Sequence, residues 1–212
     1  SSQSVDPGTS SASEPGSSGA EGNSSSSEAA SSSSVADCPA YVTDSRGGTD
    51  VTYDILKFTA DGVDKCWFKQ NLAYNYSTSK CYGGEQKNCD KYGRLYLGNS
   101  LTAICPEGSH ISTPEDWTHL AKAMGYKSAD FSTGTFVYDM GWDLKAEAEW
   151  SSCTNCTMKF KDSYGFSALP GGYYIAYMEK YGEMEETGRW WVVDGEDLGY
   201  AEVYYDNDDV KY

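Results

Sequence analysis

Ten residues of this chain, GFSALPGGYY at positions 165–174, combine three glycines with a proline and two tyrosines. Such glycines could cradle a phosphate. A Walker-type loop, however, needs a lysine followed by serine or threonine, and a helix whose N-terminus presents backbone amides. Neither feature follows these glycines, and Pro170 blocks entry into a helix. Gly171 and Gly172 instead suit a turn with positive φ. The stretch therefore predicts a strand-and-turn scaffold element.

Seven cysteines form a second group with chemical potential. Cys153 and Cys156 form a CTNC pair, which in a redox enzyme would begin a helix, but no helical stripe follows them. A zinc site would have to draw its other two ligands from the distant Cys81 and Cys89. We therefore expect either a local Cys153–Cys156 disulfide or bonds to separate partners.

Disulfides are typical of secreted proteins, and the serine-rich start of the chain favours secretion. Seven residues separate Cys81 from Cys89, so a bridge between them would close a glycine-bearing loop with little strain. This spacing predicts a Cys81–Cys89 disulfide. A Cys66–Cys105 disulfide is a second expectation, which rests only on the position of both residues beside predicted core segments.

Residues for catalysis are few. The chain has two histidines, His110 and His119, and no GxSxG motif of a serine hydrolase. With 32 acidic residues, the presence of paired carboxylates says nothing about glycoside hydrolysis. We therefore expect a protein without catalytic activity and without a cofactor.

The formal net charge of −16 argues against nucleic acid and anionic membranes as partners, because both bind basic surfaces. Solubility is one explanation for the acidic residues, and calcium binding is the alternative, because closely spaced acids supply its oxygen ligands. The weak candidates for calcium ligands are Asp206, Asp208 and Asp209. Their segment does not fit the twelve-residue calcium loop with its terminal glutamate.

Paired aromatic residues indicate binding rather than catalysis. The WW and YY pairs supply flat amphipathic rings, and nearby acids could accept hydrogen bonds from sugar hydroxyls. The opposing interpretation is that the two rings of each pair alternate along a strand, with one in the core and one outside. For the WW pair we expect one ring to be buried. The predicted ligand-binding residues are Trp190, Trp191, Tyr173, Tyr174, Asp194 and Glu196.

The elements that position these residues divide the chain in two. Residues 1–37 are a low-complexity segment with sixteen serines and no aromatic residue, which predicts a disordered tether. Residues 38–212 are long enough for one domain with a hydrophobic core. Within it, alternating apolar residues at 51–55 and the ADGVD turn predict a β-hairpin.

One helix is clear, at about residues 113–124. Thr113 can cap it, Pro114 suits its first turn, and apolar residues recur along one helical face from Trp117 to Met124. From Phe131 onward we expect short strands and long ordered loops. The predicted class is α+β.

Six motifs follow one another along the chain: TDSRGGTDVTYDILKF, CWFKQNLAY, KYGRLY, CPEGSHISTPEDW, GFSALPGGYY and RWW. Their order and spacing over residues 41–212 resemble those of the Fibrobacter succinogenes major paralogous domain family. The block from Cys105 to Trp117 also resembles the RLPTEAEWE helix start of the formylglycine-generating family. The resemblance implies a C-type-lectin-like domain with twisted antiparallel strands and long ordered loops. It also implies surface-exposed, often lipid-anchored proteins, usually without an assigned activity.

The chain departs from these families in three ways. Ser109 stands where the paralogous family tends to have tryptophan, and no cysteine follows Cys156 to form the copper-bound pair that formylglycine-generating relatives imply. The closing strand of the form GFSVRC, which would carry an eighth cysteine, is also missing before Tyr212. The domain would then lack its closing strand or close its sheet differently.

Together these features favour a non-catalytic binding or assembly module of the bacterial cell surface, which recognises polysaccharide or neighbouring surface proteins. One alternative is a structural subunit of a surface filament or layer, assembled from copies of itself. Another is an enzyme related to formylglycine-generating proteins. We expect an extracellular location, with membrane contact only through a lipid anchor upstream and with glycans on the tether.

Overall fold

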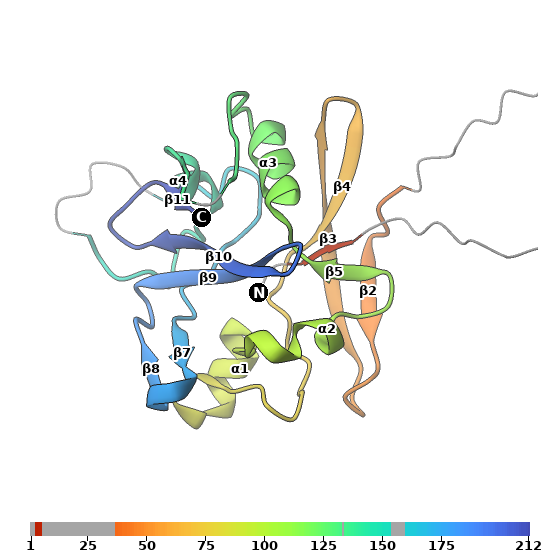
Figure 1. Cartoon of the computed structure of the whole chain (residues 1–212), viewed down its shortest axis with the longest axis vertical. Coiled ribbons are helices and arrows are strands. Elements are labelled where there is room, and N and C mark those ends of the chain that lie inside the picture. Colours follow the sequence, from red (N-terminus) through yellow and green to blue (C-terminus); the bar gives the residue numbers. More distant parts are fainter. Residues whose placement is uncertain (1–2, 6–36, 133, 154–159) are drawn as a thin grey trace, which may run out of the picture.

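The computed structural model describes residues 3–5, 37–132, 134–153 and 160–212. They form a mixed α/β fold with mostly antiparallel strands and few helices (Figure 1). The strands make a five-stranded sheet, a four-stranded sheet and a separate two-stranded pair. The structure confirms the predicted combination of mostly antiparallel strands with few helices.

The five-stranded sheet has the order β2 (Tyr41–Asp44), β3 (Val51–Ala60), β4 (Val63–Phe68), β1 (Gln3–Val5) and β5 (Ser109–Ile111). The four-stranded sheet has the order β6 (Phe136–Val137), β11 (Val210–Lys211), β10 (Asp197–Tyr204) and β9 (Thr187–Asp194). The two-stranded pair consists of β7 (Tyr173–Ile175) and β8 (Lys180–Gly182). The α-helices are α1 (Gln86–Tyr92), α2 (Leu101–Ile104), α3 (Pro114–Ala123) and α4 (Met140–Leu144). The short 3₁₀ helices are η1 (Tyr82–Gly84), η2 (Gly98–Ser100) and η3 (Ala176–Met178).

The β3–β4 hairpin has the turn that its sequence predicts. Asp61 and Gly62 connect the strands with φ angles of 51° and 76°, and Ala60 pairs with Val63 across the turn. Two consecutive residues with positive φ match the twist of the flanking strands, and Asp-Gly is a preferred sequence for such a turn.

Helix α3 confirms the predicted helix at 113–124. The side chain of Thr113 accepts a hydrogen bond from the amide of Asp116 (3.2 Å), and the Asp116 carboxylate accepts one from the amide of Thr113 (2.9 Å). This reciprocal capping satisfies two amides that the helix itself leaves unpaired. Trp117 and Leu120 are buried. The helix packs against β3, β4 and β9 and so contacts both of the larger sheets (Figure 1).

Two clusters of buried side chains share strand β9. In the larger cluster the ring of Trp117 lies 5.3 Å from that of Trp67 and 6.1 Å from that of Trp190. Trp191 packs against the smaller cluster, around Tyr96. Successive side chains of a strand point to opposite faces, so the two neighbouring tryptophans serve different cores.

Two disulfides link described residues. Cys81 bonds to Cys89, as predicted from their spacing. Cys66 bonds to Cys38, so the predicted Cys66–Cys105 disulfide is wrong. The chain enters the domain beside β4 and brings the Cα atoms of Cys38 and Cys66 to 5.6 Å, an ordinary disulfide separation. Burial raises the pKa of the Cys105 thiol to about 12.

Two predictions fall partly outside the described residues. Cys153 is disulfide-bonded, and Cys156 belongs to the stretch 154–159, which the structure does not describe. Within the predicted tether, Gln3–Val5 form β1, and residues 6–36 are not described.

The C-terminal residues are part of the four-stranded sheet. Strand β11 pairs with both β10 and β6, and the ring of Tyr212 stacks on Phe131 at 5.2 Å.

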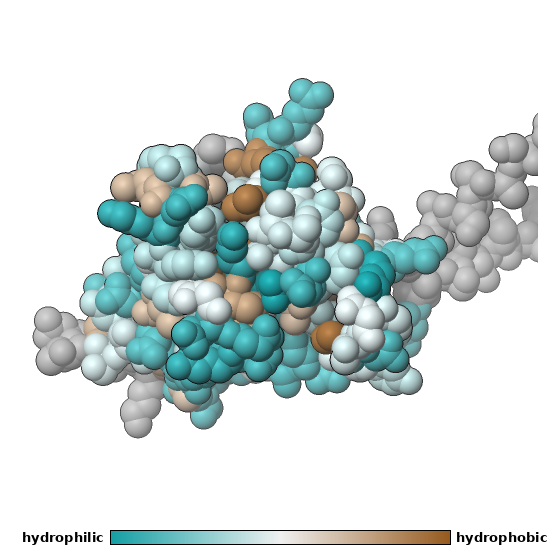
Figure 2. Space-filling model, turned by 90° about the horizontal axis from the view of Figure 1, so that it is seen from below, coloured by the Kyte–Doolittle hydropathy of each residue, from teal (hydrophilic) through white to brown (hydrophobic). Residues whose placement is uncertain are grey.

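Figure 2 shows one face of the molecule, on which hydrophilic side chains predominate and hydrophobic ones are scattered. Within the described ranges, no helix has both the length and the apolar composition needed to cross a membrane.

Candidate ligand-binding cleft

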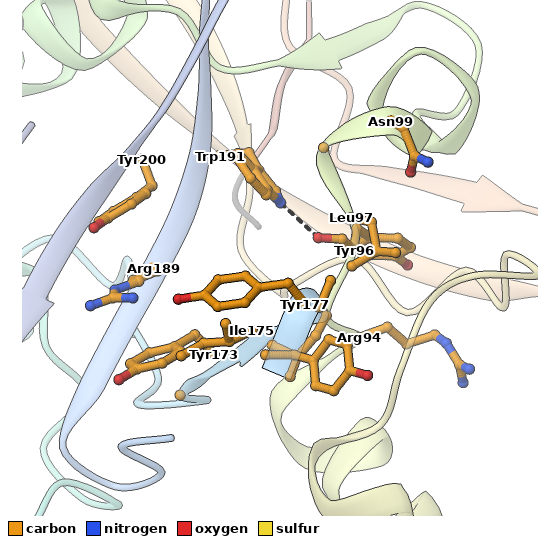
Figure 3. A pocket seen from close by; sticks show the side chains of 15 residues that line it. Arg94, Tyr96, Leu97, Asn99, Tyr173, Ile175, Tyr177, Arg189, Trp191 and Tyr200 are labelled. Carbon is orange, nitrogen blue, oxygen red and sulfur yellow. Dashed lines mark hydrogen bonds between the residues drawn. The ribbon is translucent and has the colours of Figure 1, made fainter. Parts of the chain in front are cut away.

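A cleft of about 620 Å³ lies where three segments of the chain meet (Figure 3). One wall is the extended segment that leads into η2, another is β7 with η3, and the third is formed by side chains of β9 and β10. The lining residues are Arg94, Leu95, Tyr96, Leu97, Gly98, Asn99, Gly172, Tyr173, Tyr174, Ile175, Ala176, Tyr177, Arg189, Trp191 and Tyr200.

Trp191 connects β9 to the wall at residues 94–99. Its indole Nε1–H donates to the carbonyl oxygen of Tyr96 at 2.9 Å, the bond drawn as a dashed line in Figure 3. The preceding Trp190 points the other way, is 1% exposed, and donates from its indole to Asn71 Oδ1 at 3.0 Å. The prediction that one tryptophan of the pair is buried is confirmed. Trp190 is therefore a core residue, out of reach of a ligand, and only Trp191 lines the cleft.

Arg189 lies between two tyrosine rings of the cleft. Its guanidinium carbon is 3.9 Å from the ring centre of Tyr173 and 4.7 Å from that of Tyr200. Its Nε donates to a carboxylate oxygen of Glu202 on β10 (2.5 Å). Each cation–π contact of this kind contributes about 0.5–1 kcal/mol at an exposed site. Arg189 thereby holds one ring from β7 and one from β10 on either side of it.

Gly172 allows β7 to enter the cleft wall. Its φ is +64°, and a Cβ atom at this position would lie 2.5 Å from the carbonyl oxygen of Gly182 on β8. A side chain cannot fit at that distance, and positive φ strains any residue other than glycine. The predicted positive φ is confirmed for Gly172 but not seen for Gly171. The 165–174 stretch thus orients Tyr173 and Tyr174 toward the cleft.

The mouth of the cleft is rich in exposed apolar side chains. Tyr177 is 89% exposed and Tyr200 is 43% exposed, and both line the cleft. Met178 follows on η3 and Leu198 precedes on β10, and both are exposed. Exposed apolar residues that gather around a hollow mark interaction sites more often than scattered ones do.

The lining contains no aspartate or glutamate, although the chain has 32 acidic residues against 16 basic ones. The guanidinium groups of its two arginines already have hydrogen-bond partners. Arg94 donates from Nε to Ser79 Oγ (2.7 Å) and points away from the rings in Figure 3, and Arg189 pairs with Glu202. Burial and the neighbouring Glu183 raise the pKa of Tyr173. The cleft therefore offers aromatic faces and neutral hydrogen-bonding groups, which suit an uncharged amphipathic ligand.

The structure brings together three of the six predicted ligand-binding residues. Tyr173, Tyr174 and Trp191 line the cleft. Asp194 and Glu196 lie at the exposed turn between β9 and β10 and are not among its lining residues.

The calcium candidates Asp206, Asp208 and Asp209 lie beside a buried lysine. In the described part of the chain, no group of three or more His, Cys, Asp or Glu residues could hold a metal ion. The ammonium group of Lys145 donates to the carbonyl oxygens of Tyr204 and Asn207, both at 2.5 Å. A cation from the protein itself therefore binds backbone carbonyl groups beside these aspartates.

Lys145 is fully buried, and aromatic rings surround its ammonium group. The nitrogen lies 4.6 Å from the ring of Trp142, 5.2 Å from that of Trp150 and 5.1 Å from that of Phe160. Burial lowers the pKa of Lys145 to about 8, and the three aspartates of the loop oppose this shift.

The histidines take structural positions. His110 Nε2 and Lys65 Nζ lie 3.0 and 2.7 Å from the carboxylate of Asp116, which also caps α3 through Thr113. Burial opposes ionisation of Asp116, but the hydrogen bonds from His110 and Lys65 hold the pKa of this carboxyl well below its usual range. His119 Nε2 lies 3.0 Å from the carbonyl oxygen of Val63.

Sequence reasoning missed several lining residues, above all Arg189, Tyr96, Tyr177 and Tyr200. For Arg189 a signal exists, because it lies two residues before Trp191 in a strand and so faces the same side. The segment 94–99 carries no comparable signal, since only the fold places it opposite β9.

A family model described as the Fibrobacter succinogenes major domain matches residues 60–207. No curated protein and no solved structure matches the chain significantly.

Proposed function

The chain belongs to the Fibrobacter succinogenes major domain family, and on this premise we propose that it is a non-catalytic binding module of the bacterial cell surface that recognises polysaccharide. The observation that carries the proposal is the aromatic cleft. Its volume of about 620 Å³ lies within the ordinary range for a small-ligand site, and six of its fifteen lining residues are aromatic.

Polysaccharides match the chemistry of this cleft. A sugar ring has apolar C–H faces and a rim of hydroxyls, so it can stack on a flat side chain and hydrogen-bond at its edges. Trp191, Tyr173 and Tyr200 offer such faces, and tyrosine hydroxyls and backbone groups offer polar partners. The exposed Tyr177 and Tyr200 leave the cleft mouth accessible to a long chain.

Location and finer fold class are parts of the same proposal. The Cys38–Cys66 and Cys81–Cys89 disulfides support an extracellular location, because disulfides persist in oxidising compartments. The antiparallel strands and the long loop connections between α3 and β9 support a C-type-lectin-like arrangement.

The test compares two tyrosines of similar accessibility. Tyr177 lines the cleft, and Tyr138 is 69% exposed but is not a lining residue. Binding of Tyr177→Ala and Tyr138→Ala proteins to insoluble cellulose, xylan and purified peptidoglycan would be measured by depletion from solution. Removing a ring that stacks on a ligand at the mouth of a cleft costs about 1 kcal/mol, roughly a fivefold weaker binding.

We expect Tyr177→Ala to lose this affinity and Tyr138→Ala to keep it, with both proteins melting like the parent. Equal binding by the two variants, or no binding of the parent to any of the three polymers, would overturn the proposal.

A structural subunit of a surface filament or layer is the second candidate. The exposed Tyr177, Met178, Leu198 and Tyr200 around the cleft favour it, because apolar and aromatic residues are also enriched at the centre of protein interfaces. Sedimentation of the same variants separates the candidates: loss of self-association in Tyr177→Ala without any polysaccharide binding by the parent supports a subunit.

A further inference from the structure

The five-stranded sheet is completed by three residues from the beginning of the sequence. Strands β4 and β5 are not neighbours, because β1 lies between them and pairs antiparallel with both (Figure 1). Ser4 pairs with Trp67 on one side and with His110 on the other. The sheet therefore contains a slot, bounded by β4 and β5, that accepts one strand.

The slot needs an occupant. Cys66 and Trp67, which border it on β4, are 3% and 0% exposed. Without a strand beside them, backbone amide and carbonyl groups in this buried region would lose their partners, which folded proteins avoid. Recognition through a strand uses main-chain hydrogen bonds, so any copy of the same segment can provide it.

The connection between the slot and its occupant is long. Val5 pairs with Cys66, and Cys66 is bonded to Cys38, so both ends of residues 6–36 are attached at the same place in the fold. These 31 residues separate β1 from the domain. None of the bonds that fix β1 to the described residues is covalent.

We propose that the slot between β4 and β5 is a strand-acceptor site, and that Gln3–Val5 of a second copy of this chain fills it. Copies exchange their N-terminal strands and become linked. Exchange preserves every inter-strand hydrogen bond, because the incoming residues and their register are identical. A copy that donates its strand to one neighbour and accepts a strand from another contacts two other copies. Reciprocal exchange between two copies gives a closed dimer, and exchange along a row of copies gives a linear oligomer.

Concentration decides between a copy's own strand and that of a neighbour. A serine-rich connection of this length gives a chain's own strand an effective concentration on the order of 1 mM. Exchange therefore becomes substantial when copies reach a similar local concentration, as they do when crowded on a surface.

The test uses two full-length single variants, Val5→Cys and Ser109→Cys, each with its own affinity tag. These positions face each other in register between β1 and β5. The two proteins are mixed at about 1 mM, equilibrated, oxidised mildly, and separated without reductant, and the bridge is located by peptide mapping. A bridge between positions 5 and 109 of differently tagged chains forms only when the strand of one copy enters the slot of the other. The double variant Val5→Cys/Ser109→Cys at about 1 µM is the positive control for the register.

We expect a covalent heterodimer at about 1 mM that falls at least tenfold in yield at about 1 µM, where the double variant instead forms an internal bridge. Adding Ser4→Pro to the Val5→Cys protein should abolish the heterodimer, because proline cannot donate in the centre of a sheet. Absence of the heterodimer at 1 mM, an equal yield with Ser4→Pro, or a double variant that forms no bridge would each overturn the proposal.

Discussion

Raising the pH above 8 should stabilise this fold through Lys145. Burial lowers the pKa of Lys145 to about 8 from its ordinary value of 10.5. Between these values the unfolded chain holds a proton that the folded chain has released, so the free energy of unfolding rises with pH. Over the whole interval from 8 to 10.5 the gain amounts to about 3 kcal/mol.

The surroundings of Lys145 suit a neutral amine. An uncharged amino group keeps two N–H donors, and two carbonyl oxygens, of Tyr204 and Asn207, accept from it. Loss of the proton therefore removes the penalty of a buried charge and leaves both carbonyl groups satisfied.

The assay is urea unfolding at several pH values between 7.5 and 10.5 for the parent, Lys145→Met and Lys161→Met. Lys161 is the matched control, because its side chain is 50% exposed and belongs to the same region of the fold. The stability of Lys145→Met relative to the parent should fall by about 3 kcal/mol over this range, whereas Lys161→Met should follow the parent. Parallel curves for Lys145→Met and the parent would refute the reasoning, since they would show that folding leaves the proton affinity of Lys145 unchanged.

Three further predictions follow from single residues. Asp116→Asn should lose about 2–3 kcal/mol of stability at pH 7, since it removes charge-assisted hydrogen bonds. The depressed pKa of Asp116 means that the parent loses this advantage as the pH falls below about 4, so acid titration of both proteins by circular dichroism should show their stabilities converging. Trp190→Ala should cost about 3–5 kcal/mol in urea unfolding, because it empties a fully packed site, and an unchanged midpoint would contradict its place in the core. Gly172→Ala should lower the free energy of unfolding by about 2–4 kcal/mol, because the position has positive φ and a Cβ atom there would contact Gly182. A variant with the same melting temperature as the parent would contradict that geometry.

Local signals in the sequence predicted local structure well. The cap, first-turn proline and apolar stripe of α3 all act within a few residues, and so does the Asp-Gly turn between β3 and β4. The Cys81–Cys89 disulfide closes a short loop, which the spacing alone makes feasible. Helix α1 was missed, because its seven residues, which begin inside this loop and end beyond it at Tyr92, are too few to show a helical period.

Long-range pairing was not accessible to the same reasoning. Cys66 and Cys38 are joined because β4 lies beside the first residues of the domain. The spacing of the two cysteines in the sequence does not reveal that proximity. Three rings of the two aromatic pairs, those of Tyr173, Tyr174 and Trp191, line the cleft, and strand alternation separates Trp190 from Trp191. The wall at residues 94–99, the stacking of Arg189 between two rings, and the place of Lys145 under an acidic loop all depend on segments that meet only in the folded chain.

The most direct test of the central claim is to observe the two neighbouring tryptophans while a saccharide is added. The indole N–H groups of Trp190 and Trp191 have different partners, Asn71 in the core and Tyr96 at the cleft. In ¹H–¹⁵N spectra of the labelled protein, assigned with Trp191→Phe, soluble oligosaccharides of cellulose, xylan and peptidoglycan would be titrated. Binding in the cleft predicts that the Trp191 indole signal shifts in a saturable way while the Trp190 signal stays in place. A Trp191 signal that remains unmoved across all three series would contradict the account.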